Sequence, residues 1–211
     1  QFNLYHTRIS SQPTVTPENL SKMEKELPFA VKLLPTNLNL KSVGYACTSG
    51  ATIIGPEKIE TIIKNIFPKT NVSNPISAVV NALNSLNAKK VAFVSPYIRS
   101  VTSKMREFLV KKDFIISNQI SFEQEEESIV ARIREIDTLE AILKIPKDSY
   151  DAIFISCTNL RTFNILVKAE EILKKPVISS NLALAWDMVR LSGIKSDQPD
   201  EILFPSKLFQ N

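Results

Sequence analysis

The sequence predicts an α/β protein of two pseudo-symmetric lobes, each a parallel sheet flanked by helices, with a functional cleft between them. Short β-branched apolar runs alternate with segments of helical periodicity, which is the pattern of βαβ units with right-handed crossovers. Both cysteines of the 211-residue chain fall where an apolar run ends and a helical segment begins. The apolar content of 44% is enough for one sizeable core or two small lobes.

Four apolar runs are predicted to be buried parallel strands. Each is short, rich in β-branched residues and bounded by turn residues, as expected of strands that are covered on both faces. They are residues 42–47, 90–96, 151–157 and 176–179.

Helices are predicted before and between these strands. The first begins at Pro17, a residue type favoured in the first turn, with Thr16 as its N-cap. Residues 179–181, Ser-Ser-Asn, are interpreted as the cap of the last helix rather than as a catalytic motif. The other predicted helices are residues 57–66, 76–86, 99–110, 130–143, 160–173 and 182–191.

The order of these elements divides the chain into two lobes. We expect lobe 1 to comprise residues 1–88 and 183–211 and to carry Cys47, and lobe 2 to comprise residues 89–182 and to carry Cys157. A parallel strand that is already flanked by helices needs a neighbouring strand. We therefore expect a further strand of lobe 1 upstream of Gln1, within roughly 20–40 additional residues, about the size of a βα unit.

A Cys-Thr pair occurs twice and is the most informative motif. A thiol at the carboxyl end of a strand, beside the first turn of a helix, lies near unpaired N–H groups and the positive end of the helix dipole. Such a site is expected to lower the thiol pKa from about 8.5 to roughly 3.5–7.5 and to hold carboxylates. The motif predicts acid/base or nucleophilic chemistry on a small carboxylic acid by Cys47 and Cys157, with hydrogen bonds from Thr48, Ser49, Thr158 and Asn159.

Tyr97 is expected to join the two cysteines. It follows the strand predicted at residues 90–96, and ligands of open α/β sheets bind at the carboxyl ends of the strands. The three side chains are therefore predicted to meet at one rim. The alternative is that both cysteines are small buried hydrophobic residues, the commonest role of a free cysteine. Two cysteines in a chain of this length do not resemble a disulfide framework.

Composition argues against several other kinds of function. Four glycines do not supply a dinucleotide fingerprint or a phosphate loop, so no cofactor is expected. Two cysteines and His6 do not supply a zinc site, and His6 is interpreted as a surface or lobe-packing residue. Lys+Arg exceed Asp+Glu by 26 − 22 = 4 without a basic-aromatic stripe, so no nucleic-acid partner is expected. No membrane span or signal peptide is predicted, which makes the cytoplasm the expected location.

Several motifs together carry a family resemblance. They are YACTSG at residues 45–50, SPY at 95–97, VARI at 130–133, CTNLRT at 157–162, and PVISSN followed by ALAW at 176–186. From about residue 6 to residue 194 the chain resembles the maleate cis-trans isomerase branch of the aspartate/glutamate racemase superfamily. The resemblance implies a cofactor-independent enzyme, usually a homodimer, with one cysteine of each lobe facing the substrate.

The same resemblance implies a mechanism. In maleate isomerases the first-lobe cysteine, here Cys47, adds to the double bond, the resulting single bond rotates, and elimination releases fumarate. The second cysteine, here Cys157, exchanges a proton, and the tyrosine matching Tyr97 helps to hold the intermediate. Decarboxylases of this scaffold characteristically keep only the second cysteine, so the presence of Cys47 argues against decarboxylation.

Two alternatives remain open. In racemases of the superfamily the cysteine pair removes and returns a proton at opposite faces of a Cα, so an aspartate/glutamate-type racemase with an amino-dicarboxylate substrate is the first. A non-catalytic carboxylate-binding protein that has kept the cleft is the second. The favoured prediction is isomerisation of a small dicarboxylate.

The chain departs from the maleate isomerase pattern at one position that can be checked. A substrate-binding asparagine of that branch would fall near Glu127 or Ser128, where no asparagine occurs. We expect Ser128 or backbone amides to line the pocket there and Glu127 to point to solvent. A second family asparagine, at the end of the first strand, would lie upstream of Gln1.

Overall fold

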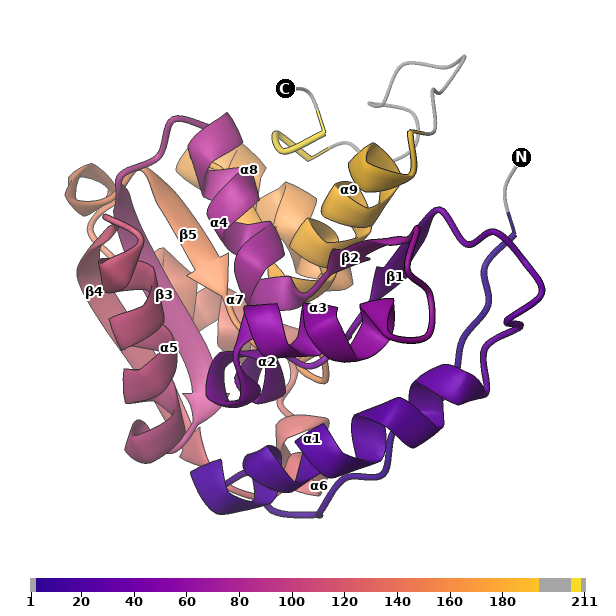
Figure 1. Cartoon of the computed structure of the whole chain (residues 1–211). Coiled ribbons are helices and arrows are strands. Elements are labelled where there is room, and N and C mark those ends of the chain that lie inside the picture. Colours follow the sequence, from indigo (N-terminus) through magenta and orange to yellow (C-terminus); the bar gives the residue numbers. More distant parts are fainter. Residues whose placement is uncertain (1–2, 194–205, 210–211) are drawn as a thin grey trace.

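The computed structural model describes residues 3–193 and 206–209, whose strands form two parallel sheets (Figure 1). The larger sheet has the order β4-β3-β5-β6, and the smaller pairs β1 with β2. The predicted α/β class with parallel sheets flanked by helices is confirmed. The strands are β1 (Ser42–Gly44), β2 (Asn71–Ser73), β3 (Lys90–Tyr97), β4 (Ile115–Gln124), β5 (Ala152–Ile155) and β6 (Val177–Ser179).

The helices surround both sheets. In Figure 1, α5 lies in front of β3 and β4, which it contacts, and α8 lies behind, where it contacts β6. None of the helices in the described ranges is long and apolar enough to cross a bilayer. Their bounds are α1 (Pro17–Lys32), α2 (Thr48–Ile54), α3 (Pro56–Lys64), α4 (Pro75–Ser85), α5 (Arg99–Lys111), α6 (Glu127–Val130), α7 (Glu135–Leu143), α8 (Leu166–Leu173) and α9 (Ser180–Ser192).

The centre of the larger sheet is fully buried. Every residue of β3 after Lys90 is buried, and so are all residues of β5. Phe93 and Phe154 on these neighbouring strands stack with ring centroids 5.5 Å apart. Burial on both faces explains why these strands are continuous apolar runs rather than alternating ones.

Helix α9 follows the last strand of the larger sheet but packs on the smaller one. It contacts β1, β2 and α4. Its buried Asp187 accepts hydrogen bonds from Ser73 Oγ at 2.5 Å and from Asn81 Nδ2 at 3.0 Å. Helix α9, from the last part of the chain, therefore packs on elements formed by the first part.

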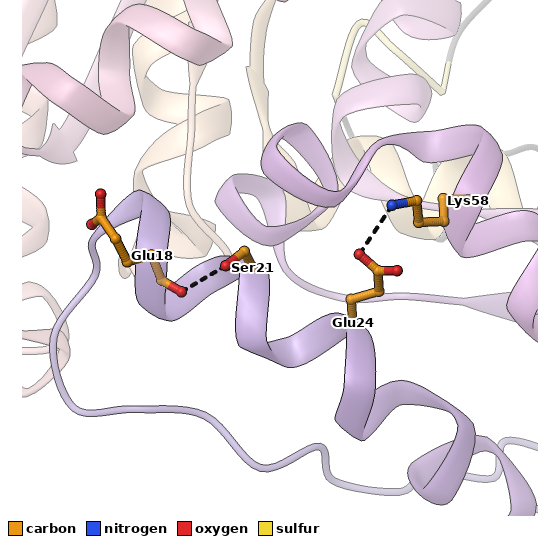
Figure 2. A network of polar contacts seen from close by, with 4 residues as sticks. All are labelled: Glu18, Ser21, Glu24 and Lys58. Atoms are coloured by element: carbon orange, nitrogen blue, oxygen red, sulfur yellow. Dashed lines mark hydrogen bonds and ion pairs between the residues drawn. The ribbon is translucent and has the colours of Figure 1, made fainter.

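Helix α1 packs against α2 and α3. Thr16 is its N-cap as predicted, because Thr16 Oγ1 accepts the N–H of Asn19 at 3.2 Å. Figure 2 shows the exposed ion pair that joins α1 to α3, between Lys58 Nζ and Glu24 Oε2 at 3.1 Å. An exposed pair of this kind is worth at most about 1 kcal/mol, so burial of the apolar face of α1 holds this contact.

Two predicted helices differ from the observed ones. The helix predicted at residues 130–143 is interrupted by a turn at 131–134, so that α6 and α7 are separate. The helix predicted at residues 160–173 begins only at Leu166, after an irregular segment and a short 3-10 turn (Phe163–Ile165). Thr158 and Asn159, directly before this segment, make hydrogen bonds to other parts of the chain.

Strands β2 and β4 were not predicted. Strand β2 has only three residues, and β4 is an edge strand with polar side chains along its length, IISNQISFEQ. An edge strand is half exposed and lacks the continuous apolar run of the central strands.

Candidate active site

Cys47 is the N-cap of α2, as the first Cys-Thr pair predicts. Its Sγ accepts the N–H of Gly50 at 3.3 Å and lies 3.6 Å from Ser49 Oγ. A Cβ at position 50 would collide with the Tyr45 hydroxyl and lie 3.1 Å from Cys47 Sγ. Glycine at this position therefore leaves room for the thiol.

Cys157 has a different environment from Cys47. It follows β5, is fully buried, and has a φ of +92°, in the region that non-glycine residues rarely adopt. No helix follows Cys157 directly. The two thiols are therefore alike only in following the end of a strand. A backbone conformation of this kind costs about 1–3 kcal/mol and persists only when neighbouring contacts hold it. Cys157 Sγ accepts the N–H of Asn159 at 3.2 Å.

Tyr97 lies against the second thiol. It is the last residue of β3, beside β5 in the sheet, and its Oη is 2.9 Å from Cys157 Sγ. The tyrosine is almost completely buried, and its carbonyl oxygen accepts hydrogen bonds from Thr102 and Ser121. The predicted meeting of Tyr97 and Cys157 at the ends of neighbouring strands is thus found.

The segments that carry the two cysteines are joined by hydrogen bonds. Ser180 Oγ accepts from Thr48 Oγ1 at 2.8 Å and from the N–H of Cys157 at 3.1 Å. Thr158 Oγ1 donates to the carbonyl oxygen of Ala46 at 2.9 Å. Thr48 and Thr158, predicted to bind substrate, therefore hold the two cysteine segments together.

Glu127 faces the site, so the prediction that it points to solvent is wrong. Its Oε2 accepts from Asn159 Nδ2 at 2.8 Å, and its Oε1 accepts from Tyr97 Oη at 3.4 Å. Ser128 is exposed, and its carbonyl oxygen accepts from Arg132 Nε at 2.7 Å. The carboxylate turns inward because Tyr97 and Asn159 each offer it a hydrogen-bond donor.

Burial dominates the protonation of the site. It raises the pKa of Cys47, raises that of Cys157 to about 12, and raises that of Tyr97 well above its usual value. The negative charge of Glu127 adds to all three increases. The N–H of Gly50 and the Ser49 hydroxyl act in the opposite direction on Cys47, but burial outweighs them although the residue keeps some exposed surface. The expectation that a helix end lowers these pKa values is therefore wrong for this structure, because desolvation disfavours the thiolate.

Two residues of the site have roles that the sequence did not predict. Ser180 was interpreted as part of a helix cap, but Ser179 is the N-cap of α9 and Ser180 links the cysteine segments. Glu127 was interpreted as solvent-facing. His6 lies on the surface, and the described residues contain no group of three or more potential metal-ligating side chains.

Comparisons with known proteins agree with this geometry. The family model described as arylmalonate decarboxylase matches residues 55–202. A maleate isomerase of Geobacillus stearothermophilus is 22% identical over 205 residues, with 93% of this chain and 81% of that protein covered. An arylmalonate decarboxylase of Bordetella bronchiseptica is 27% identical over 179 residues, with 83% and 70% covered.

A solved structure shows the same fold. It is a maleate cis-trans isomerase of Nocardia farcinica, in a cysteine-to-serine variant with a covalently bound succinylcysteine intermediate. It superposes with a TM-score of 0.85 at 22% identity, covering 100% of this chain and 86% of that chain.

Proposed function

This chain belongs to the arylmalonate decarboxylase family, and we propose that within it the protein is a cofactor-independent isomerase of the maleate isomerase type. Its reaction would interconvert the cis and trans forms of a small unsaturated carboxylic acid. The observation that carries this proposal is the presence of two thiols in one site, on segments joined through Ser180. Decarboxylation by this scaffold needs only the thiol at Cys157.

The two thiols have complementary roles in the proposed reaction. The Cys47 thiol first loses its proton to solvent, and the resulting thiolate forms a C–S bond to one alkene carbon while the electron pair of the double bond moves to the other carbon. Cys157 donates its proton there, which leaves a single bond that can rotate. The Cys157 thiolate then takes the proton back, the double bond re-forms, and the C–S bond breaks to regenerate the Cys47 thiolate.

The remaining residues serve these steps. Tyr97 Oη, 2.9 Å from Cys157 Sγ, stabilises the thiolate that forms when Cys157 gives up its proton. Ser49, 3.6 Å from Cys47 Sγ, and Asn159 contact the substrate, with Ser128 at the exposed rim. Thr48 and Thr158 act as positioning residues. The covalent succinylcysteine of the Nocardia farcinica enzyme supports a cysteine adduct of this kind.

An aspartate/glutamate-type racemase is the second candidate, and Glu127 favours it. A carboxylate in the site attracts an ammonium group, which a substrate of maleate type lacks. The two reactions differ in what happens to the Cα proton, because racemisation exchanges it with solvent.

Proton NMR in deuterated water separates these candidates. With maleate, we expect fumarate to form without added metal or organic cofactor and at the same rate after dialysis against a chelator. With L-aspartate and L-glutamate, we expect no exchange at Cα. Exchange of either amino acid without formation of fumarate would establish the racemase instead.

The covalent step has its own test. In a Cys157→Ser variant incubated with maleate, we expect the peptide that contains Cys47 to gain the mass of one substrate molecule. A Cys47→Ser variant should gain nothing. Labelling that is equal in both variants would exclude Cys47 as the nucleophile.

The overall organisation is proposed on the same basis. We propose the division into residues 1–88 plus 183–211 and residues 89–182. It is supported by the strands, because β1 and β2 fall in the first part and β3 to β6 in the second. The boundary after residue 182 falls within α9, and residues 1–2, 194–205 and 210–211 of lobe 1 lie outside the described ranges. Both cysteines are free thiols, as expected of a cytoplasmic protein. Light scattering during gel filtration tests the homodimer that the resemblance implies.

A further inference from the structure

We propose that Glu127 makes this site select an acid whose second polar group is an N–H donor, such as a half-amide, over a dicarboxylate. The proposal rests on the proposed function, since it takes the substrate to lie between the two thiols. It assigns to Glu127 the role of a specificity-determining residue.

The donors near Cys157 already hold a carboxylate. Tyr97 Oη and Asn159 Nδ2 each donate to one oxygen of Glu127, at 3.4 and 2.8 Å. The Tyr97 hydroxyl and the Asn159 amide are also donors that could hold a substrate carboxylate. Glu127 therefore occupies, as an anion of the protein itself, the place that the second carboxylate of a dicarboxylate would need.

No ion pair holds this charge in the described part of the chain. The ion pairs there join other residues, and Glu127 takes part in none of them. The side chain of Arg132 donates to the carbonyl oxygen of Ser128 rather than to the Glu127 carboxylate. A substrate carboxylate placed beside Glu127 would meet a like charge, whereas an N–H group would find an acceptor.

The backbone fixes Glu127 in this position. Its N–H donates to the carbonyl oxygen of Pro13 at 3.0 Å, and the N–H of Val15 donates to Glu125 at 2.8 Å. Thr14 and Glu126 form an antiparallel bridge between these two segments. These bonds fix the main chain at Glu127, and two side-chain donors hold its carboxylate, which together limit its freedom to move aside for a second anion.

The experiment compares maleate with its half-amide, maleamate, because the two share carbon skeleton and size. The ratio of their kcat/KM values is measured by NMR for the wild-type chain, for Glu127→Gln and for Glu126→Gln. The last variant is a matched control, since Glu126 is an exposed neighbour that loses the same charge. We expect the wild type to favour maleamate at least tenfold. Glu127→Gln should lower that preference at least tenfold, and Glu126→Gln should change it less than threefold.

Two outcomes would overturn the inference. One is that the wild type prefers maleate and that Glu127→Gln changes the ratio of the two kcat/KM values less than threefold. The other is an equal loss on both substrates in Glu127→Gln, because this would place the carboxylate in catalysis or folding rather than in selection.

A binding measurement keeps this inference separate from the proposed function. Protection of Cys47 from alkylation gives the relative affinities of maleate and maleamate without turnover. If no variant isomerises either compound, the proposed function fails. The affinity ratio in the wild type and in Glu127→Gln then decides the inference by the same tenfold criterion.

Discussion

The hydroxyl oxygen of Tyr97 lies 2.9 Å from the sulfur of Cys157, and both groups are buried at the ends of neighbouring strands. Burial favours the neutral thiol, which suits a proton donor, and the hydroxyl stabilises the thiolate once the proton has left. In the proposed reaction this pair would let Cys157 give up a proton and take it back within one turnover, although burial raises its pKa to about 12.

Tyr97→Phe should lower kcat by about 10- to 100-fold with a smaller effect on KM. The variant removes a hydrogen bond to a developing thiolate, and such bonds to charged groups are worth about 1.5–3 kcal/mol. Steady-state kinetics with maleate or maleamate checks this. Tyr150→Phe is the matched control, because the Tyr150 hydroxyl is buried and has no hydrogen-bond partner among the described residues. An equal loss in both variants would show a packing effect.

Ser180→Ala should destabilise the protein by about 1–3 kcal/mol, since it leaves the Thr48 hydroxyl and the Cys157 N–H without their acceptor. Urea unfolding measures the change. Combined with Thr48→Val in a double-mutant cycle, it should give a coupling energy of at least about 0.5 kcal/mol. Ser179→Ala, which removes only the cap of α9, should show no coupling to Thr48→Val.

Cys47 should be alkylated more slowly than a free cysteine at pH 7, and the rate should rise with pH beyond 8.5. Burial raises its pKa, so the reactive thiolate becomes abundant only at alkaline pH. Alkylation of the Cys157→Ser variant between pH 6 and pH 10 isolates this thiol. A rate that levels off below pH 8 would show that the pKa is lowered instead.

The raised pKa of Cys157 also links stability to pH. The folded protein binds the thiol proton more tightly than the unfolded chain, so this stabilisation is complete below about pH 8.5. It is lost as the pH rises toward the folded value of about 12. The Tm of the wild type should therefore fall more steeply between pH 8 and pH 11 than that of Cys157→Ala. Parallel curves of Tm against pH for the two proteins would contradict a raised pKa of Cys157.

Gly50→Ala should displace the Cys47 thiol and lower activity at least tenfold. The added Cβ would collide with the Tyr45 hydroxyl and lie 3.1 Å from Cys47 Sγ, and overpacking of this kind costs about 1–3 kcal/mol. Adding Tyr45→Phe to Gly50→Ala should restore part of the stability, because it removes the atom that collides. Melting curves of both variants test this, and a double variant no more stable than Gly50→Ala would place the strain elsewhere.

Much of the molecule could be predicted from local patterns. The strands that contain β1, β3, β5 and β6 are apolar runs, and the helices that start at Pro17 and Arg99 carry clear periodicity or caps. Edge strand β4 could not be predicted in this way, because only its pairing with β3 distinguishes its mixed polar sequence from a loop. The break between α6 and α7 could not be predicted from local patterns either, because the helical periodicity of the sequence continues across it.

The sequence by itself determined the class of fold and the positions of the two thiols and Tyr97 near strand ends. These features depend on the alternation of strand and helix patterns and on short-range spacing. Only the tertiary structure decided which neighbours those residues meet. Ser180 and Glu127 come from parts of the chain distant from Cys47, and their roles arise from hydrogen bonds across the site. The pKa values of the thiols likewise depend on burial by the whole fold, and for this reason a local rule about helix ends gave the wrong direction.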